Sequence, residues 1–243
     1  MSGMTVFFII VDLIICLCLP TILAVLMIVR RKASWKAFVL GIAVFSIFQI
    51  FTRLPILGAL QGTGWFTLFA QTNTVAYILI LAFTAGLFEE GGRFIGMRFF
   101  MKNGLTWDNG VAFGLGHGGV EAFVIAGLPV LIGALTGDAA ITAVPPYLFL
   151  VSGLERALAV TLHIGMTMLV LYGVKCRRLR FLVYAILFHM AVDSGALLSL
   201  PFGQNVWISE GYAAVFTVLS IVMIVKFKPL IDNNEAIITK WRF

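Results

Sequence analysis

The sequence predicts an all-α, polytopic membrane helix bundle of about seven transmembrane helices. Hydrophobic residues make up 61% of the 243 positions and charged residues only 12%, whereas a soluble domain carries roughly a quarter charged residues. The apolar residues form successive runs, most of them long enough to cross a hydrocarbon core of about 30 Å. Basic residues are concentrated in alternate connectors between these runs. These observations favour a membrane bundle over a soluble domain.

Short polar or glycine- and proline-containing connectors separate the apolar runs. Spans are expected near residues 5–29, 37–60, 70–97, 110–135, 146–174, 181–200 and 210–227. The first is expected to be a retained helix, because no Lys or Arg precedes it as in a signal peptide. The second is the most irregular, since Arg53 and Pro55 interrupt it. With no linker or repeat between the runs, residues 1–243 are predicted to form a single transmembrane domain with a catalytic-type core at 70–200.

The positions of the basic residues predict how the chain is oriented. Fourteen of the 17 Lys and Arg lie in connectors 30–36, 98–102 and 175–180 or in the tail from Lys226 onward. Lys and Arg are enriched in cytoplasmic loops. We therefore expect a multi-pass protein of the plasma membrane with its N-terminus outside and its C-terminus in the cytoplasm. The net charge of +6 follows from these loops, so the expected partner is the lipid bilayer and no nucleic-acid partner is expected.

Several ionisable residues lie inside the predicted spans, where each costs about 2.5–3.5 kcal/mol near mid-bilayer. They are Asp12, Glu89, Glu90, Arg93, His117, Glu121, Glu155, Arg156, His163, His189 and Asp193. Such a set is tolerable only if its members face the bundle interior and meet one another. Asp12 is expected to lie apart, as a helix-packing residue. Glu155 and Arg156 are read mainly as structural residues, which point about 100° apart and are not expected simply to neutralise each other.

Four of these residues are expected at one depth. Glu89, His117, His163 and His189 each lie eight to twelve residues from a polar connector on the predicted cytoplasmic side, or roughly 12–18 Å at the rise of an α-helix. They come from four different spans and include all three histidines of the chain. The sequence therefore predicts a shared polar pocket in the cytoplasmic half of the membrane.

Spacing along each helix supports this pocket. Three pairs are four residues apart and so share a face: Glu89 with Arg93, His117 with Glu121, and His189 with Asp193. Arg156 and His163 are seven apart, again on one face. Glycines crowd the helix around His117, which permits a close approach of neighbouring backbones.

The same residues carry a resemblance to a known family. Phe88–Arg93 (FEEGGR), Gly114–Ala122 (GLGHGGVEA), Glu155-Arg156 with His163, and Phe188–Asp193 (FHMAVD) resemble motifs of the YhfC family of bacterial membrane peptidases, in the same order. The chain is more distantly similar to the PrsW proteases and to the CAAX prenyl endopeptidase and bacteriocin-immunity group. The CAAX group places its Arg four residues after the second Glu, whereas Arg93 is three after Glu90. Processing of prenylated proteins is therefore not implied.

The resemblance implies peptide hydrolysis, which needs an activated water, a polarised carbonyl and a proton for the leaving amine. It implies Glu89 as the residue that activates water, with Glu90 second, and His117 as a residue that holds this water or a metal. His163 and His189 become further metal ligands or oxyanion donors. The expected supporting residues are Arg93, Glu121, Arg156 and Asp193.

Two mechanisms and two classes of function remain open. A zinc site made of His117, His163, His189 and Glu89 would keep an open position, but no His-Glu-x-x-His helix is present, and a metal-free glutamate mechanism explains the same residues. The main hypothesis is an intramembrane endopeptidase acting on a membrane-embedded or membrane-proximal peptide or protein substrate. The alternative is a proton- or ion-coupled transporter, or a non-enzymatic binding or immunity protein, that uses the same cavity.

Overall fold

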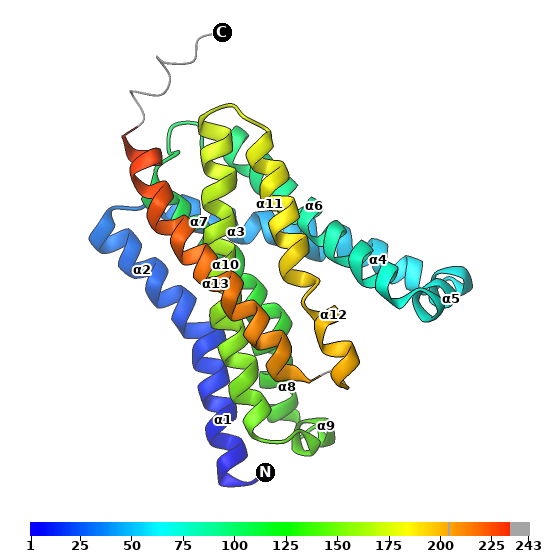
Figure 1. The fold of residues 1–243 in the computed structure, drawn as a ribbon. Coiled ribbons are helices and arrows are strands. Elements are labelled where there is room, and N and C mark those ends of the chain that lie inside the picture. The colour runs from blue at the N-terminus through cyan, green and yellow to red at the C-terminus, as the bar shows by residue number, and fades with distance from the viewer. Residues whose placement is uncertain (204, 234–243) are drawn as a thin grey trace.

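The computed structural model describes residues 1–203 and 205–233, and every regular element in these ranges is helical (Figure 1). Seven helices in the described ranges are long and apolar enough to cross a membrane. They span Gly3–Arg31, Trp35–Gln61, Thr74–Phe100, Trp107–Thr136, Tyr147–Lys175, Arg180–Ser199 and Val206–Asp232. The predicted all-α, multi-pass bundle is thus confirmed. The orientation stays a prediction, and Lys240 and Arg242 of the basic tail lie outside the described residues.

Three spans are unbroken helices and four are composite. The unbroken ones are α6 (Thr74–Phe100), α10 (Tyr147–Lys175) and α13 (Val206–Asp232). The composite spans are α1 (Gly3–Leu13), η1 (Ile14–Cys18) and α2 (Leu19–Arg31); α3 (Trp35–Phe45), η2 (Ser46–Arg53) and α4 (Leu54–Gln61); α7 (Trp107–Glu121), η3 (Ala122–Gly127) and α8 (Leu128–Thr136); and α11 (Arg180–Asp193) with α12 (Ala196–Ser199). The short elements α5 (Gly64–Thr72), α9 (Ala139–Ala143) and η4 (Leu200–Phe202) lie in connectors. The predicted third span began too early, because residues 70–72 belong to α5.

A proline accounts for each interruption of the first, second and fourth spans. The segments η1, η2 and η3 are π-helical, and Pro20, Pro55 and Pro129 each stand at the second residue after one of them. Proline offers no N–H and its ring collides with the carbonyl four residues earlier, so a wider π turn accommodates it. In the second span this turn carries Gln49 and Arg53, and both side chains are buried.

Helix α10 lies at the centre of the bundle and contacts α1, α6, α7, α11 and α13. In its most apolar window 67% of the residues are buried, compared with at most 33% in the other six spans. The outer faces of the surrounding helices expose large apolar side chains such as Phe51 and Phe100, as contact with lipid requires. A residue on α10 is therefore within reach of side chains from most of the other helices.

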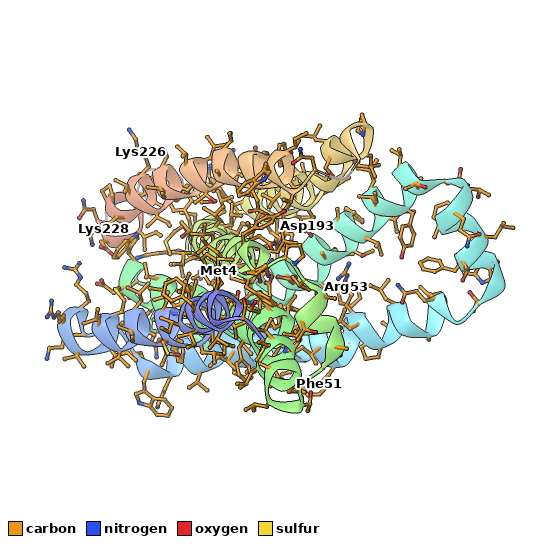
Figure 2. The ribbon with its side chains drawn as sticks, turned by 90° about the horizontal axis from the view of Figure 1, so that it is seen from below. Met4, Phe51, Arg53, Asp193, Lys226 and Lys228 are labelled. Carbon is orange, nitrogen blue, oxygen red and sulfur yellow. The ribbon has the colours of Figure 1, made fainter. Side chains whose placement is uncertain are left out.

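Helices α4 and α5 and the first turns of α6, residues 54–80, project sideways from the bundle (Figures 1 and 2). We call this segment the arm. Its two sides are held together near the tip, where the rings of Phe66 and Tyr77 lie 5.6 Å apart. Arg53 lies at the base of the arm, and Asp193 lies nearby on the adjacent side of the bundle (Figure 2).

Helices α3 and α7 cross at two glycines whose substitution should destabilise the bundle. A Cβ on Gly41 would collide with the carbonyl oxygen of Phe113, and one on Gly116 with the carbonyl oxygen of Phe38. Because backbone cannot move aside easily, we expect Gly41→Ala and Gly116→Ala each to lower the free energy of unfolding by about 1–3 kcal/mol. Thermal unfolding in detergent measures this. The control is Gly91→Ala on α6, where a Cβ would meet nothing within 4 Å; equal melting temperatures for all three variants would contradict the prediction.

Candidate active site

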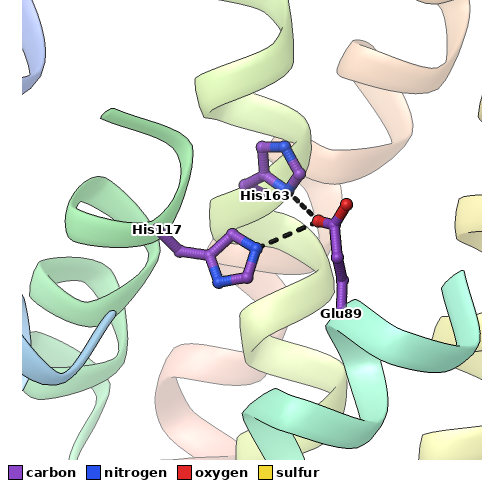
Figure 3. A group of neighbouring side chains, drawn as sticks. All are labelled: Glu89, His117 and His163. Carbon is purple, nitrogen blue, oxygen red and sulfur yellow. Dashed lines mark hydrogen bonds and ion pairs between the residues drawn. The ribbon is translucent and has the colours of Figure 1, made fainter. Parts of the chain in front are cut away.

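A glutamate and two histidines from three helices meet inside the bundle (Figure 3). Glu89 comes from α6, His117 from α7 and His163 from α10. His117 Nε2 lies 3.0 Å from Glu89 Oε2, within hydrogen-bond distance, and His163 Nδ1 lies 4.0 Å from the same oxygen. All three side chains are buried. Residues far apart in the sequence thus converge on one carboxylate.

A second row of charged groups packs against this cluster. Arg93 donates hydrogen bonds to Glu90 Oε1 and to His163 Nδ1, and its guanidinium lies 3.9 Å from Glu89. His189, from α11, bonds through Nδ1 to Glu90 Oε1 at 2.9 Å, and its Nε2 lies 4.0 Å from Glu89 Oε1. Arg93 and Glu90 are completely buried, so each neutralises much of the other's charge.

The remaining supporting residues lie around the two histidines of α10 and α11. His163 Nε2 contacts the Glu121 carboxylate, to which Arg156 also donates at 3.1 Å. Asp193 Oδ2 lies 3.5 Å from His189 Nε2. The structure therefore brings every sequence-predicted site residue into one network, and their catalytic roles stay predictions.

One sequence expectation about these residues is wrong. Arg156 forms an ion pair with its neighbour Glu155 as well as with Glu121. The two adjacent Cα–Cβ directions do diverge on a helix, but the long arginine and glutamate side chains bend back far enough to meet. Asp12 lies apart from the cluster as expected, buried on α1, where the Cys16 thiol approaches its Oδ1 at 3.7 Å.

A cavity of about 580 Å³ opens beside the cluster. Glu89, His163 and His189 form part of its wall, and Glu155, Asp193 and Glu210 line it as well. Between these polar groups the wall is apolar, with Leu81, Ala82, Ala85, Leu158, Ala159 and Leu162 among its residues. Glu89, His163 and His189 are thus buried in the fold and border a cleft, whereas His117 lies behind them.

Four polar residues that the sequence did not assign to the site also line the cavity: Gln49 and Arg53 on η2, and Ser209 and Glu210 on α13. Arg53 donates to Leu81 O at 2.7 Å and to Thr84 Oγ1 at 3.3 Å, which fixes it against α6. One sequence pattern could have indicated Gln49 and Arg53, because Phe45, Gln49 and Arg53 recur every four residues. In the structure the first of these residues lies at the cluster, with the ring of Phe45 5.2 Å from that of His117.

Glu89, His117 and His163 have the donor types and separations of a metal site. One ligand atom from each lies within 4.8 Å of the other two. Zinc bonds to imidazole nitrogen and carboxylate oxygen are about 2.0–2.2 Å long, so two ligands of a tetrahedral ion lie roughly 3.3 Å apart, and small shifts would suffice. Arg93 donates to His163 Nδ1, so metal binding at that nitrogen requires the guanidinium to release it. His189 lies outside this three-residue group.

Comparisons with known proteins identify the family of this chain. The family described as YhfC intramembrane metalloprotease matches residues 15–140 and 134–213. A protein of Bacillus subtilis (strain 168), described as uncharacterized membrane protein YhfC, is 33% identical over a match that covers 82% of this chain and 88% of that protein. No solved structure matches. Because the family match spans most of the chain and includes all the residues of the cluster, the protein belongs to the YhfC intramembrane metalloprotease family.

Proposed function

We propose that this protein is an intramembrane endopeptidase of the bacterial plasma membrane that hydrolyses a peptide bond in or next to the bilayer. The observation that carries the proposal is the buried Glu89–His117–His163 group beside the 580 Å³ cavity. The donor set is that of a zinc site with an open position. These three residues would hold the ion, and when bound it would polarise the scissile carbonyl and make water more acidic.

The two oxygens of Glu89 face different neighbours, which suggests different tasks. Oε2 lies near both His117 and His163, whereas Oε1 lies 4.0 Å from His189 Nε2. We assign Oε1 to accept the proton of the attacking water and to pass it to the leaving amine, so that no net proton is gained or lost.

The surroundings of His189 support a role in stabilising charge on the carbonyl oxygen of the substrate. Its Nδ1 is engaged by Glu90, while its Nε2 faces Glu89 and Asp193 at the cavity. Carboxylate partners fix the orientation of an imidazole ring. We assign the His189 imidazolium, which carries a proton on each ring nitrogen because carboxylates face both, to donate from Nε2–H to the developing oxyanion, and Arg93 as the cation that keeps Glu90 in place.

The decisive experiment tests whether the protein cleaves membrane proteins and whether this cleavage requires metal. Purified protein in lipid nanodiscs is incubated with bacterial membrane proteins, and new N-termini are mapped by mass spectrometry. We expect termini in or close to transmembrane segments, their loss after chelation, and their return with Zn²⁺. Identical termini with and without the protein would contradict the proposal, and proton or cation flux into liposomes in their place would support transport instead.

The metal content of alanine variants should show which of the three histidines bind the metal and which only lie beside it. Because His117 and His163 belong to the three-residue group, alanine at either position should weaken zinc binding by more than about 100-fold, whereas loss of an outer partner costs about 10–100-fold. His189→Ala should therefore retain more metal than either ligand variant. Elemental analysis after dialysis against graded chelator measures this. Equal loss in all three variants would make His189 a ligand.

A further inference from the structure

We infer that the cavity binds an extended peptide segment and that the Gln49 carboxamide pairs with the backbone of that segment. This inference rests on the proposed function, because it identifies the form in which a substrate would lie beside Glu89. Three features carry it: the dimensions of the cavity, the state of the Gln49 side chain, and the distance of Gln49 from the cluster.

The cavity wall extends over about three turns of each of two helices. On α6 it runs from Ile78 to Glu89 and on α10 from Glu155 to Met166, which is about 16 Å on each at 1.5 Å per residue. An extended chain advances about 3.3 Å per residue, so roughly five residues fit. The backbone N–H and C=O groups of a helix are already paired with one another, whereas an extended segment offers them to the cavity wall. Pairing with a side chain of the wall therefore favours an extended segment.

Gln49 is a buried polar side chain whose carboxamide oxygen has no partner in the part of the chain that the structure describes. It is 9% exposed, it lines the cavity, and its Oε1 makes no hydrogen bond within the described residues. A buried carbonyl left unpaired costs about 1–3 kcal/mol, so a ligand that satisfies it is favoured. A carboxamide offers N–H donors and a C=O acceptor, which match the C=O and N–H of a peptide backbone.

Gln49 lies close to the bond that would react. It follows Phe45 by four residues, about 6 Å of helix, and the ring of Phe45 lies 5.2 Å from that of His117. These two steps together span about 11 Å, so the backbone group that Gln49 contacts is within about three residues of the scissile bond. Arg53, one turn further out, already donates to Leu81 and Thr84, so Gln49 is the better placed of the two to pair with a ligand backbone.

The test measures binding apart from cleavage. The parent is Glu89→Gln, and the probe is a fluorescent, N-acetylated and C-amidated hexapeptide of alternating alanine and leucine. Fluorescence anisotropy in nanodiscs gives Kd for this peptide and for analogues with single backbone amides replaced by esters, which removes one N–H each. We expect Gln49→Met to raise Kd about tenfold, the effect of one lost hydrogen bond. Gln71→Met, at an exposed glutamine on α5, is the control and should leave Kd unchanged.

If Gln49 pairs with the backbone of the peptide, the effects of the ester replacement and of Gln49→Met on Kd should not be additive. One ester analogue should bind the parent about tenfold more weakly than the amide peptide, and should bind the Gln49→Met variant no more weakly than the amide peptide. Failure of the parent to bind the probe, unchanged Kd in Gln49→Met, or an ester effect that survives in that variant would each overturn the inference. Binding with these properties by a wild-type protein that never cleaves would instead refute the protease proposal alone.

Discussion

Replacing Glu89 with glutamine is expected to lower the rate of peptide cleavage by about 10²–10⁴-fold, the usual contribution of a general acid–base residue. Glutamine keeps the shape of the side chain and an oxygen that accepts from His117, whose Nε2 lies 3.0 Å away. It loses the carboxylate that would take the proton from water through one oxygen and help to hold the metal through the other. Initial rates on a substrate found by terminus mapping give the size of the effect, and the melting temperature reports whether the bundle remains folded.

The same substitution at Glu155 is the matched control for Glu89. Glu155 also lines the cavity, but its side chain is 42% exposed and pairs with Arg156 rather than with a histidine. We expect Glu155→Gln to keep its rate within about threefold, because exposed ion pairs contribute little. Similar rates for the two variants, or a loss at Glu89 that follows unfolding alone, would remove Glu89 from the proposed chemistry.

Arg93→Met should destabilise the protein by about 3–5 kcal/mol, the cost of breaking a buried ion pair from one side. Arg93 and Glu90 are both completely buried, so among the described residues methionine leaves the Glu90 carboxylate with His189, 2.9 Å away, as its remaining partner. Reversible unfolding in mixed micelles measures the difference from the wild type. Because Arg93 also donates to His163, the variant should lose activity even where it remains folded.

A second substitution tests this explanation of Arg93. Adding Glu90→Gln removes the uncompensated charge, so the double variant should recover part of the lost free energy of unfolding. As a comparison, Lys228→Met breaks the partly exposed Lys228–Asp232 pair, in which the side chains are 40% and 34% exposed. That change should cost less than about 1 kcal/mol. Equal destabilisation by Arg93→Met and Lys228→Met would mean that burial of the ion pair does not determine how much free energy of unfolding is lost.

Much of the fold follows from strong local signals. A run of twenty apolar residues has few alternatives to a membrane helix, so all seven spans were predicted, with ends within five residues of those observed. Depth was also readable, because the rise per residue is constant. This placed Glu89, His117, His163 and His189 at one level, and the structure brings their side chains together.

The sequence did not predict which side chains on different helices contact each other. His117 and Glu121 share a helix face, yet His117 contacts Glu89 and Glu121 contacts His163. Spacing shows which residues share a face, but the partner across the interface depends on the rotation and crossing of both helices. The sequence did not single out Gln49 as a site residue, because a neutral amide adds little to the cost of membrane insertion compared with a charged residue.

By itself, the amino-acid sequence determined that this protein is a helical membrane bundle, and that Glu89 and the three histidines lie at one level along their helices, because both depend on properties of single helices. Only the tertiary structure decided that Arg93 joins Glu90 to His163, that Arg156 turns back to Glu155, and that Gln49 faces the cavity. These outcomes depend on how helices rotate and pack against one another, which involves residues far apart in the chain.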